Sequence, residues 1–147
     1  MGACVFCDSV PDLVHVVGGT IYEDEHVYAR HFYGDEGPAY LGHLMIMSKR
    51  HAPSFAELTD ADAQAVGLLI ARLSRALKAC TQAEHVYAVF YGEVVPHVHV
   101  HVTARYPDTP SEYLRWNVED WPAAPRGGPQ EIEALCDRLR TYLRAAS

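Results

Sequence analysis

Long hydrophobic runs are absent from this sequence of 147 residues. A membrane-spanning helix requires roughly 18 or more consecutive apolar residues, and no window of the chain approaches that length. The sequence also begins without the basic stretch and following apolar run of a secretory signal. We therefore expect a cytoplasmic protein that has no membrane partner.

Basic side chains are in short supply. The chain has 12 Lys and Arg residues against 19 Asp and Glu residues, which gives a formal net charge of −7. Non-specific binding of nucleic acid requires a basic stripe on the surface, so this balance argues against a nucleic-acid partner. Any anionic ligand has to be held by groups that are local to its site.

Cysteine is also scarce, with four residues in the chain. Four cysteines without a secretory signal indicate reduced thiols rather than a disulfide framework. Cys4 and Cys7 form a C-x-x-C pair, which suits a redox motif, half of a zinc site or two small hydrophobic residues. A redox pair is expected at the start of a helix that follows a strand, and very little chain precedes Cys4. Zinc is therefore favoured, provided that two further ligands exist elsewhere.

Short β-branched and aromatic runs separated by turn residues predict antiparallel strands, and apolar residues at helical spacing predict two amphipathic helices. A chain of this length buries about two-thirds of its unfolded surface, so a single domain over 1–147 is expected. The predicted strands are 13–17, 20–23, 26–31, 41–48, 86–91 and 96–105, and the predicted helices are 60–80 and one that begins at Pro129.

Three histidines alternate with valines in the segment His97-Val98-His99-Val100-His101-Val102-Thr103. Side chains of an extended strand alternate between its faces, so the histidines are expected on one face and the valines in the core. Histidines on one face stand about 7 Å apart, close enough for neighbouring rings to share a phosphate-sized ligand. A plain exposed strand face is the alternative, although three titratable rings in a row gain little from packing.

The segment 97–103 matches the H-φ-H-φ-H-φ-φ signature of the histidine triad (HIT) family, where φ is an apolar residue. The segments 21–27 and 42–51 resemble that family's "YEDE" hairpin and "GHLLVIPKRH" strand. The resemblance covers about 4–105 and leaves 106–147 as a C-terminal extension with a helix. It implies an α+β fold, in which an antiparallel sheet of about five strands packs with a long helix, and it implies a homodimer.

The resemblance also implies hydrolysis or transfer at the α-phosphorus of a nucleotide through a covalent nucleotidyl-histidine. His99 would be the nucleophile, and His101 would orient that ring and share charge at the phosphoryl oxygens. Members that phosphorolyse dinucleotides tend to carry Gln at the third triad position, so the histidine here favours hydrolysis. Nucleoside phosphoramidates and dinucleoside polyphosphates are the implied substrates.

Zinc-bearing members resemble this chain in their N-terminal C-x-x-C pair. The implied zinc ligands are Cys4, Cys7, His51 and His97. Two thiolates and two imidazoles make a closed structural site with no vacancy for water. Zinc would therefore position the triad segment rather than act as the catalyst.

Substrate-binding residues depart from the family pattern. Gly92-Glu93-Val94 stands where the family usually has Gly-Gln-Ser/Thr, so a neutral amide has become a carboxylate and a hydroxyl has become an isopropyl group. An acidic residue that many members use for the ribose is replaced by Phe32, and Asp35 is the nearest carboxylate. We expect Glu93 to face the pocket and to disfavour ordinary adenine dinucleotides.

Two other functions fit the same residues. A metallohydrolase could use the three histidines as ligands of a catalytic metal, although such a site also needs a water and usually a carboxylate base. A non-catalytic nucleotide-binding or scaffold protein could keep the fold, and the altered Gly92-Glu93-Val94 segment favours it. Metal content and turnover on a simple adenosine phosphoramidate would separate the three.

Overall fold

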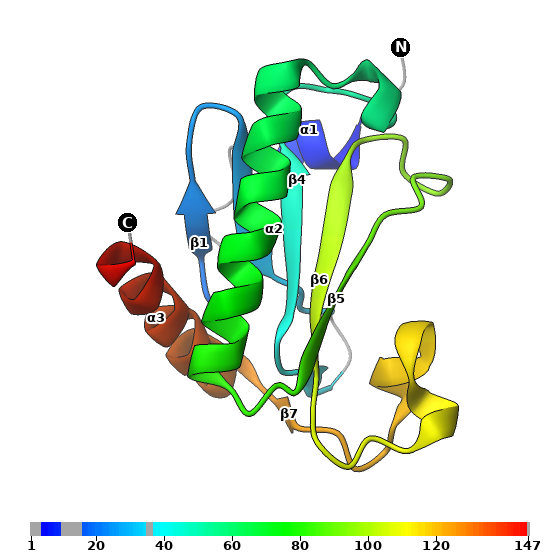
Figure 1. Ribbon diagram of the computed structural model, residues 1–147, viewed down its shortest axis with the longest axis vertical. Helices are drawn as coiled ribbons and strands as arrows, with labels where there is room; N and C mark the ends of the chain where they lie inside the picture. Colours follow the sequence, from blue (N-terminus) through cyan, green and yellow to red (C-terminus); the bar gives the residue numbers. More distant parts are fainter. Residues whose placement is uncertain (1–3, 10–15, 35–36, 147) are drawn as a thin grey trace.

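An antiparallel sheet of five strands forms the centre of the structure, which is a computed structural model that describes residues 4–9, 16–34 and 37–146 (Figure 1). The strands lie in the order β1-β2-β4-β6-β5. Their bounds are β1 (Thr20–Glu23), β2 (Val27–His31), β4 (His43–Ser48), β5 (His85–Val89) and β6 (His99–Arg105). The antiparallel sheet, the long helix and the C-terminal helix confirm the predicted α+β fold.

The register of the central strand β4 determines which side chains share a face. Met45 lies opposite His101 of β6 and opposite Arg30 of β2. Because side chains alternate along a strand, Ile46 and its cross-strand partner Val100 point to the other face. The sheet therefore has one face of aliphatic side chains and one face that carries His99 and His101.

Two helices cover the aliphatic face. In α2 (Asp60–Cys80) and α3 (Pro129–Ala145), apolar residues recur at helical spacing and are buried against the sheet. Thr59 caps α2 by accepting a hydrogen bond from the backbone N–H of Asp62 at 3.1 Å. Figure 1 shows α2 running along the sheet with α3 beside its C-terminal half.

The histidine face is covered in two separate places. At one end α1 (Val5–Ser9) lays Phe6 over Tyr28, Met45 and Met47, which together form a second, smaller hydrophobic cluster. At the other end lies the segment that follows β6. No helix in the described part of the chain is long and apolar enough to cross a membrane.

The C-terminal extension packs against the sheet before it reaches α3. It contains two short 3₁₀ helices, η3 (Ser111–Tyr113) and η4 (Arg115–Asp120), and then β7 (Arg126–Gly127), which pairs with β3 (Ala39–Tyr40). Val118 of η4 is buried in the main hydrophobic core. The extension is thereby anchored by Val118 within η4 and by the β7–β3 pairing that follows it.

Several details add to the predictions or differ from them. The triad strand begins at His99, because His97 and Val98 make other contacts, and Val98 donates its backbone N–H to the carbonyl of Ala52 at 2.8 Å. His31, in the predicted strand 26–31, is fully buried. Most of the predicted strand 13–17 lies outside the described residues, and Val16 and Val17 belong to a turn. A further short 3₁₀ helix, η2 (Phe55–Glu57), precedes α2.

Candidate active site and metal centre

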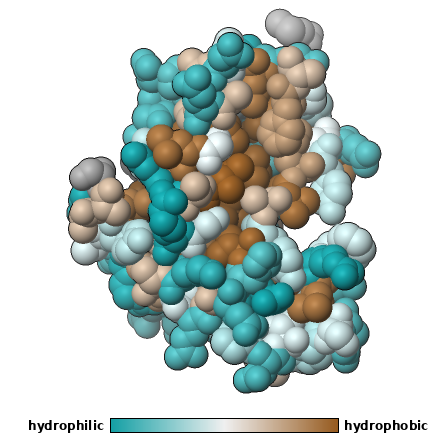
Figure 2. All heavy atoms as spheres, in the orientation of Figure 1, coloured by the Kyte–Doolittle hydropathy of each residue, from teal (hydrophilic) through white to brown (hydrophobic). Residues whose placement is uncertain are grey.

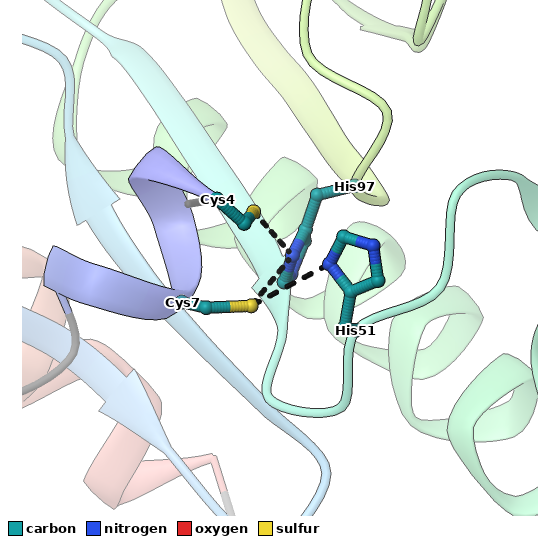
Figure 3. A group of neighbouring side chains, drawn as sticks. All are labelled: Cys4, Cys7, His51 and His97. Atoms are coloured by element: carbon teal, nitrogen blue, oxygen red, sulfur yellow. Dashed lines mark hydrogen bonds between the residues drawn. The ribbon is translucent and has the colours of Figure 1, made fainter. Parts of the chain in front are cut away.

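The four predicted metal ligands lie together (Figure 3). Cys4 and Cys7 come from α1 and the residue before it, His51 follows β4, and His97 precedes β6. Their ligand atoms all lie within 4.8 Å of one another. The Nδ1 atom of His97 is 3.3 Å from the Cys4 sulfur and 3.5 Å from the Cys7 sulfur.

The donor set suits a tetrahedral zinc ion. Zinc–sulfur bonds of about 2.3 Å and zinc–nitrogen bonds of about 2.0 Å place neighbouring ligand atoms about 3.3 to 3.8 Å apart. The second nitrogen of His97, Nε2, lies 2.7 Å from the Ser48 carbonyl oxygen and donates its proton there. The lone pair of Nδ1 then points toward the two sulfurs. A metal-bound histidine commonly has this arrangement, in which the other ring nitrogen donates to a backbone carbonyl. Burial lowers the pKa of His97, which favours the neutral ring that a metal needs.

An ion-pair cluster holds the chain next to His51. The Arg50 side chain donates from Nε to the Asp62 carboxylate at 2.9 Å, and its second nitrogen donates to the Glu57 carbonyl at 2.7 Å. His26 lies 3.0 Å from the other oxygen of Asp62. These contacts fix the end of β4, and hence the position of His51, against the start of α2.

His99 has its tautomer set by the backbone. Its Nδ1 atom lies 2.6 Å from the carbonyl oxygen of His97, so Nδ1 carries a proton and donates it. The ring is packed between Phe6 and Phe90, with centroid distances of 4.7 and 5.3 Å. The remaining nitrogen, Nε2, therefore keeps an available lone pair on a ring of fixed orientation.

His101 leads into a chain of polar contacts. Its Nδ1 lies 2.8 Å from Nε2 of His43, and Nδ1 of His43 is in direct contact with the carboxylate of Glu119. Burial, together with the nearby rings of His43 and His99, lowers the pKa of His101 to about 4. Burial opposes the charge on Glu119, but His43 and Arg126 outweigh it and lower the pKa of that carboxyl.

A cavity of about 420 Å³ opens beside His101. Its volume falls within the roughly 300–1,000 Å³ range that is typical of small-molecule sites. Its lining is mainly apolar and aromatic, and it includes Tyr87, Tyr91 and, from η4, Arg115 and Trp116. A planar group could stack there within reach of one cationic side chain.

The predicted substrate-binding residues are divided between two places. Phe32 is 40% exposed and stacks on the ring of His43 at a centroid distance of 4.8 Å. Glu93 and Val94 lie on an exposed turn, away from the cavity beside His101. Gly92 has φ of +77° and lies against the ring of Phe90, so a side chain at this position would collide with it. Asp35 lies outside the described residues.

Two residues of the site were not predicted from sequence. His43 belongs to the segment 42–51 that carries the family resemblance, so that motif could have indicated it. Glu119 has no such signal, because it lies in an extension without recognisable pattern and reaches His43 only through the fold. The two side chains contact each other, but they are far apart in the sequence, so no short-range pattern predicts the contact.

Comparison with known proteins agrees with this geometry. The sequence model of the HIT domain matches residues 15–108. An uncharacterized HIT-like protein of Mycoplasma genitalium is 30% identical over 109 residues, which cover 71% of this chain and 74% of that protein. The chain belongs to the histidine triad (HIT) family. Membership supports a nucleotide-binding or hydrolase type of function in general terms.

Solved HIT structures share the fold. A zinc-bound histidine triad family protein from Mycobacterium smegmatis has a TM-score of 0.70 at 20% identity, with 98% of this chain and 95% of that chain covered. A hypothetical histidine triad nucleotide-binding protein from Sulfolobus tokodaii has a TM-score of 0.69 at 21% identity, with 97% and 93% covered. The HIT-domain match ends at residue 108, so η4 and Glu119 lie beyond it.

Proposed function

We propose that this HIT protein is a nucleotide hydrolase or transferase that acts at the α-phosphorus through a covalent nucleotidyl-His99. The observation that carries the proposal is the hydrogen bond from His99 Nδ1 to the His97 carbonyl, which places the lone pair of the neutral ring on Nε2. A neutral imidazole attacks phosphorus well and can leave again, so it divides one difficult displacement into two easier ones.

The chemistry has two steps. In the first, Nε2 of His99 bonds to the α-phosphorus, the bond from phosphorus to the leaving group breaks, and the leaving group takes up a proton. In the second, a water oxygen bonds to phosphorus, the phosphorus–nitrogen bond breaks and the water gives up a proton. His101, on the same face and 5.3 Å away between ring centroids, is placed to interact with the phosphoryl oxygens.

The substrate we propose is a nucleoside phosphoramidate or a dinucleoside polyphosphate. Arg30 lies on the histidine face, one strand from His101 on the far side of β4, and its Nε is buried without a hydrogen-bond partner in the described part of the chain. It would supply the local positive charge that an anionic substrate requires. The cavity beside His101 would take a planar part of the substrate among the rings of Trp116, Tyr87 and Tyr91.

Zinc at Cys4, Cys7, His51 and His97 would be structural. Four protein ligands leave no position for a water, and the site joins α1 to the segment just before the nucleophile. The competing metallohydrolase is disfavoured because His97 faces the two thiols, whereas His101 contacts His43. The three histidines of the triad therefore do not converge on one point.

A homodimer in the cytoplasm is the assembly that we propose. β5 is the end strand of the sheet, and its outer edge has no strand partner among the described residues. Hydrophobic side chains gather on the middle of the α2 face in Figure 2, and Leu68 of α2 is 52% exposed. An open strand edge beside exposed apolar side chains is a surface that a second copy would cover. Leu68→Glu should yield monomers in sedimentation velocity, with exposed Leu68→Ala as the milder control.

The decisive experiment replaces His99. We expect His99→Asn to abolish turnover of adenosine phosphoramidate and to leave nucleotide binding nearly unchanged, because only the attacking nitrogen is lost. Wild-type protein quenched in acid-free conditions should carry a nucleotidyl group on His99 by peptide mass spectrometry. The matched control is His85→Asn, which changes an exposed histidine on the neighbouring strand.

Two results would overturn the assignment. If His99→Asn keeps its activity while His101→Asn loses it, the roles of the two histidines are wrong. If wild-type protein binds nucleotides but turns over no member of a phosphoramidate and dinucleotide panel, the non-catalytic binding function is the correct one.

A further inference from the structure

A carboxylate from outside the HIT match completes a row of three side chains that ends at the site. Glu119 contacts Nδ1 of His43, and Nε2 of His43 lies 2.8 Å from Nδ1 of His101. His43 is only 8% exposed, and Glu119 is its only partner at Nδ1 in the described part of the chain. A buried imidazole in contact with a carboxylate and a second imidazole is a proton-carrying arrangement.

Glu119 determines which nitrogen of His43 carries a proton. The charge of His43 then determines which nitrogen of His101 does. Ionised Glu119 can only accept, so His43 Nδ1 carries a proton. If His43 is neutral, its Nε2 accepts, and His101 must donate from Nδ1 and keep a lone pair on Nε2. If His43 is an imidazolium ion, it donates to His101, and His101 instead presents a proton on Nε2.

We propose that Glu119 is a positioning residue that makes His43 and His101 a proton relay for the reaction at His99. This inference rests on the proposed function. η4 lies beyond the family match, and the inference gives this segment a role in proton transfer at the site.

The protons balance over one catalytic cycle. In the first step His101 gives its Nε2 proton to the leaving group and takes one at Nδ1 from the His43 imidazolium ion, which becomes neutral. In the second step the attacking water gives a proton to His101 Nε2, and the Nδ1 proton returns to His43 Nε2. The positive charge again rests on His43 beside Glu119, and the relay is restored.

The carboxylate is held in place from two sides. Val118, its neighbour in η4, is 4% exposed and buried in the main core. Arg126 of β7 donates a hydrogen bond to the Glu119 backbone carbonyl, and its charge favours the ionised side chain. A carboxylate anchored in this way can orient an imidazole without a loss of side-chain freedom during the reaction.

Charged and titratable groups from four elements lie around His43. His101 and His99 come from β6, His31 from β2, Arg126 from β7 and Glu119 from η4. Glu119 is the negative member of this group. Removal of its charge therefore takes away the anionic partner that Nδ1 of His43 contacts.

The test compares Glu119→Gln with Asp120→Asn in the full-length protein. Asp120 is the next residue of η4 and is exposed, so it controls for the loss of one negative charge in the segment. With a nucleoside phosphoramidate whose leaving amine is poor, we expect Glu119→Gln to lower kcat by about ten-fold or more, a part of what general acid–base catalysis contributes. KM should stay within about two-fold, and the loss should shrink when the leaving group needs no proton, because a relay acts on proton transfer.

A second readout does not depend on activity. In ¹⁵N–¹H spectra of the imidazole nitrogens, Glu119→Gln should change the Nδ1–H signal of His43, because this group loses its carboxylate partner, while Asp120→Asn should leave the signal unchanged. If Glu119→Gln fails to fold, Glu119→Asp replaces it, and a smaller loss of kcat with the same dependence on leaving group is expected.

The proposal is overturned if Glu119→Gln matches Asp120→Asn both in kcat across leaving groups and in the His43 spectrum. It is also overturned if the loss is equal for good and poor leaving groups, which would indicate a structural effect. If the wild-type protein shows no turnover, the proposed function has failed, and the spectra alone then decide whether Glu119 sets the proton state of His43.

Discussion

Replacement of Asp62 tests how the end of β4 is held beside the proposed zinc site. Asp62 is 4% exposed and accepts a hydrogen bond from Arg50 at 2.9 Å, with His26 at 3.0 Å from its other oxygen. Loss of a charge-assisted hydrogen bond to a buried carboxylate costs about 1.5–3 kcal/mol. The Arg50 side chain is 47% exposed, so solvent screening reduces the contribution of its ion pair to the free energy of unfolding. We expect Asp62→Asn to lower the free energy of unfolding by about 2 kcal/mol.

The effect should depend on pH in a definite direction. Burial opposes the charge on Asp62, but hydrogen bonds from Arg50, Thr59 and His26 outweigh it and lower its pKa below the ordinary 3.8. A depressed carboxyl pKa gives stability that is present above pH 3.8 and is lost as the pH falls through the folded pKa. The hydrogen bond that His26 donates to Asp62 raises the pKa of His26 above 6.5, so that contribution is present below pH 6.5 and is lost as the pH rises through the folded value.

The difference in stability between wild type and Asp62→Asn should therefore be largest between about pH 4 and 6.5 and should shrink on both sides. Urea denaturation of both proteins across pH 3.5–9, with equal zinc, measures this difference and cancels effects that the two share. At the maximum the melting temperature should fall by about 4–8 °C for a chain of this size. Asp60→Asn, an exposed carboxylate in the same helical turn, is the control. A difference that is constant across the whole pH range would refute the ion-pair interpretation.

Three other predictions concern the site. Purified protein should contain about one zinc ion per chain, and Cys7→Ser should lose the metal and lower the melting temperature, because metal affinity is part of the folding free energy; elemental analysis of chelator-free protein without zinc would contradict this. Gly92→Ala should lower kcat without a comparable change in nucleotide affinity, because the new Cβ would lie 2.4 Å from Phe90 and displace this ring, which packs on His99. The left-handed backbone at this position adds about 1 kcal/mol of strain. Unchanged steady-state kinetics would show that Phe90 and His99 are not displaced. Glu93→Gln should change kcat/KM by less than about two-fold, because the carboxylate lies on an exposed turn where solvent and salt screen its charge. A ten-fold rise would show instead that Glu93 faces the phosphate, as expected from the sequence.

The local patterns of the sequence determined most of the scaffold. Alternation of histidine and valine predicted which side chains of β6 face the core, and Val100 and Val102 are buried as expected. The spacing of apolar residues predicted α2 over 60–80, which matches its observed bounds. Such periodicities report a strand or helix directly, because each is set by the geometry of a single element.

The family motifs predicted the triad and the group of candidate metal ligands. Cys4, Cys7, His51 and His97 are spread over most of the chain, and no local pattern joins them. Their grouping was predictable because the resemblance carries information about a fold that local periodicity does not contain. The same motif included His43, yet its contact with His101 became evident only from the pairing of β4 with β6.

The tertiary structure alone decided the remainder. The triad strand starts at His99 because Ser48 and the thiols contact His97. His31 is buried because it pairs with Leu44 on the face of the sheet that the helices cover. Glu119 meets His43 only because Val118 enters the core and the extension pairs β7 with β3. Contacts between residues so far apart in sequence depend on how whole elements pack, and no short-range pattern of residues encodes that packing.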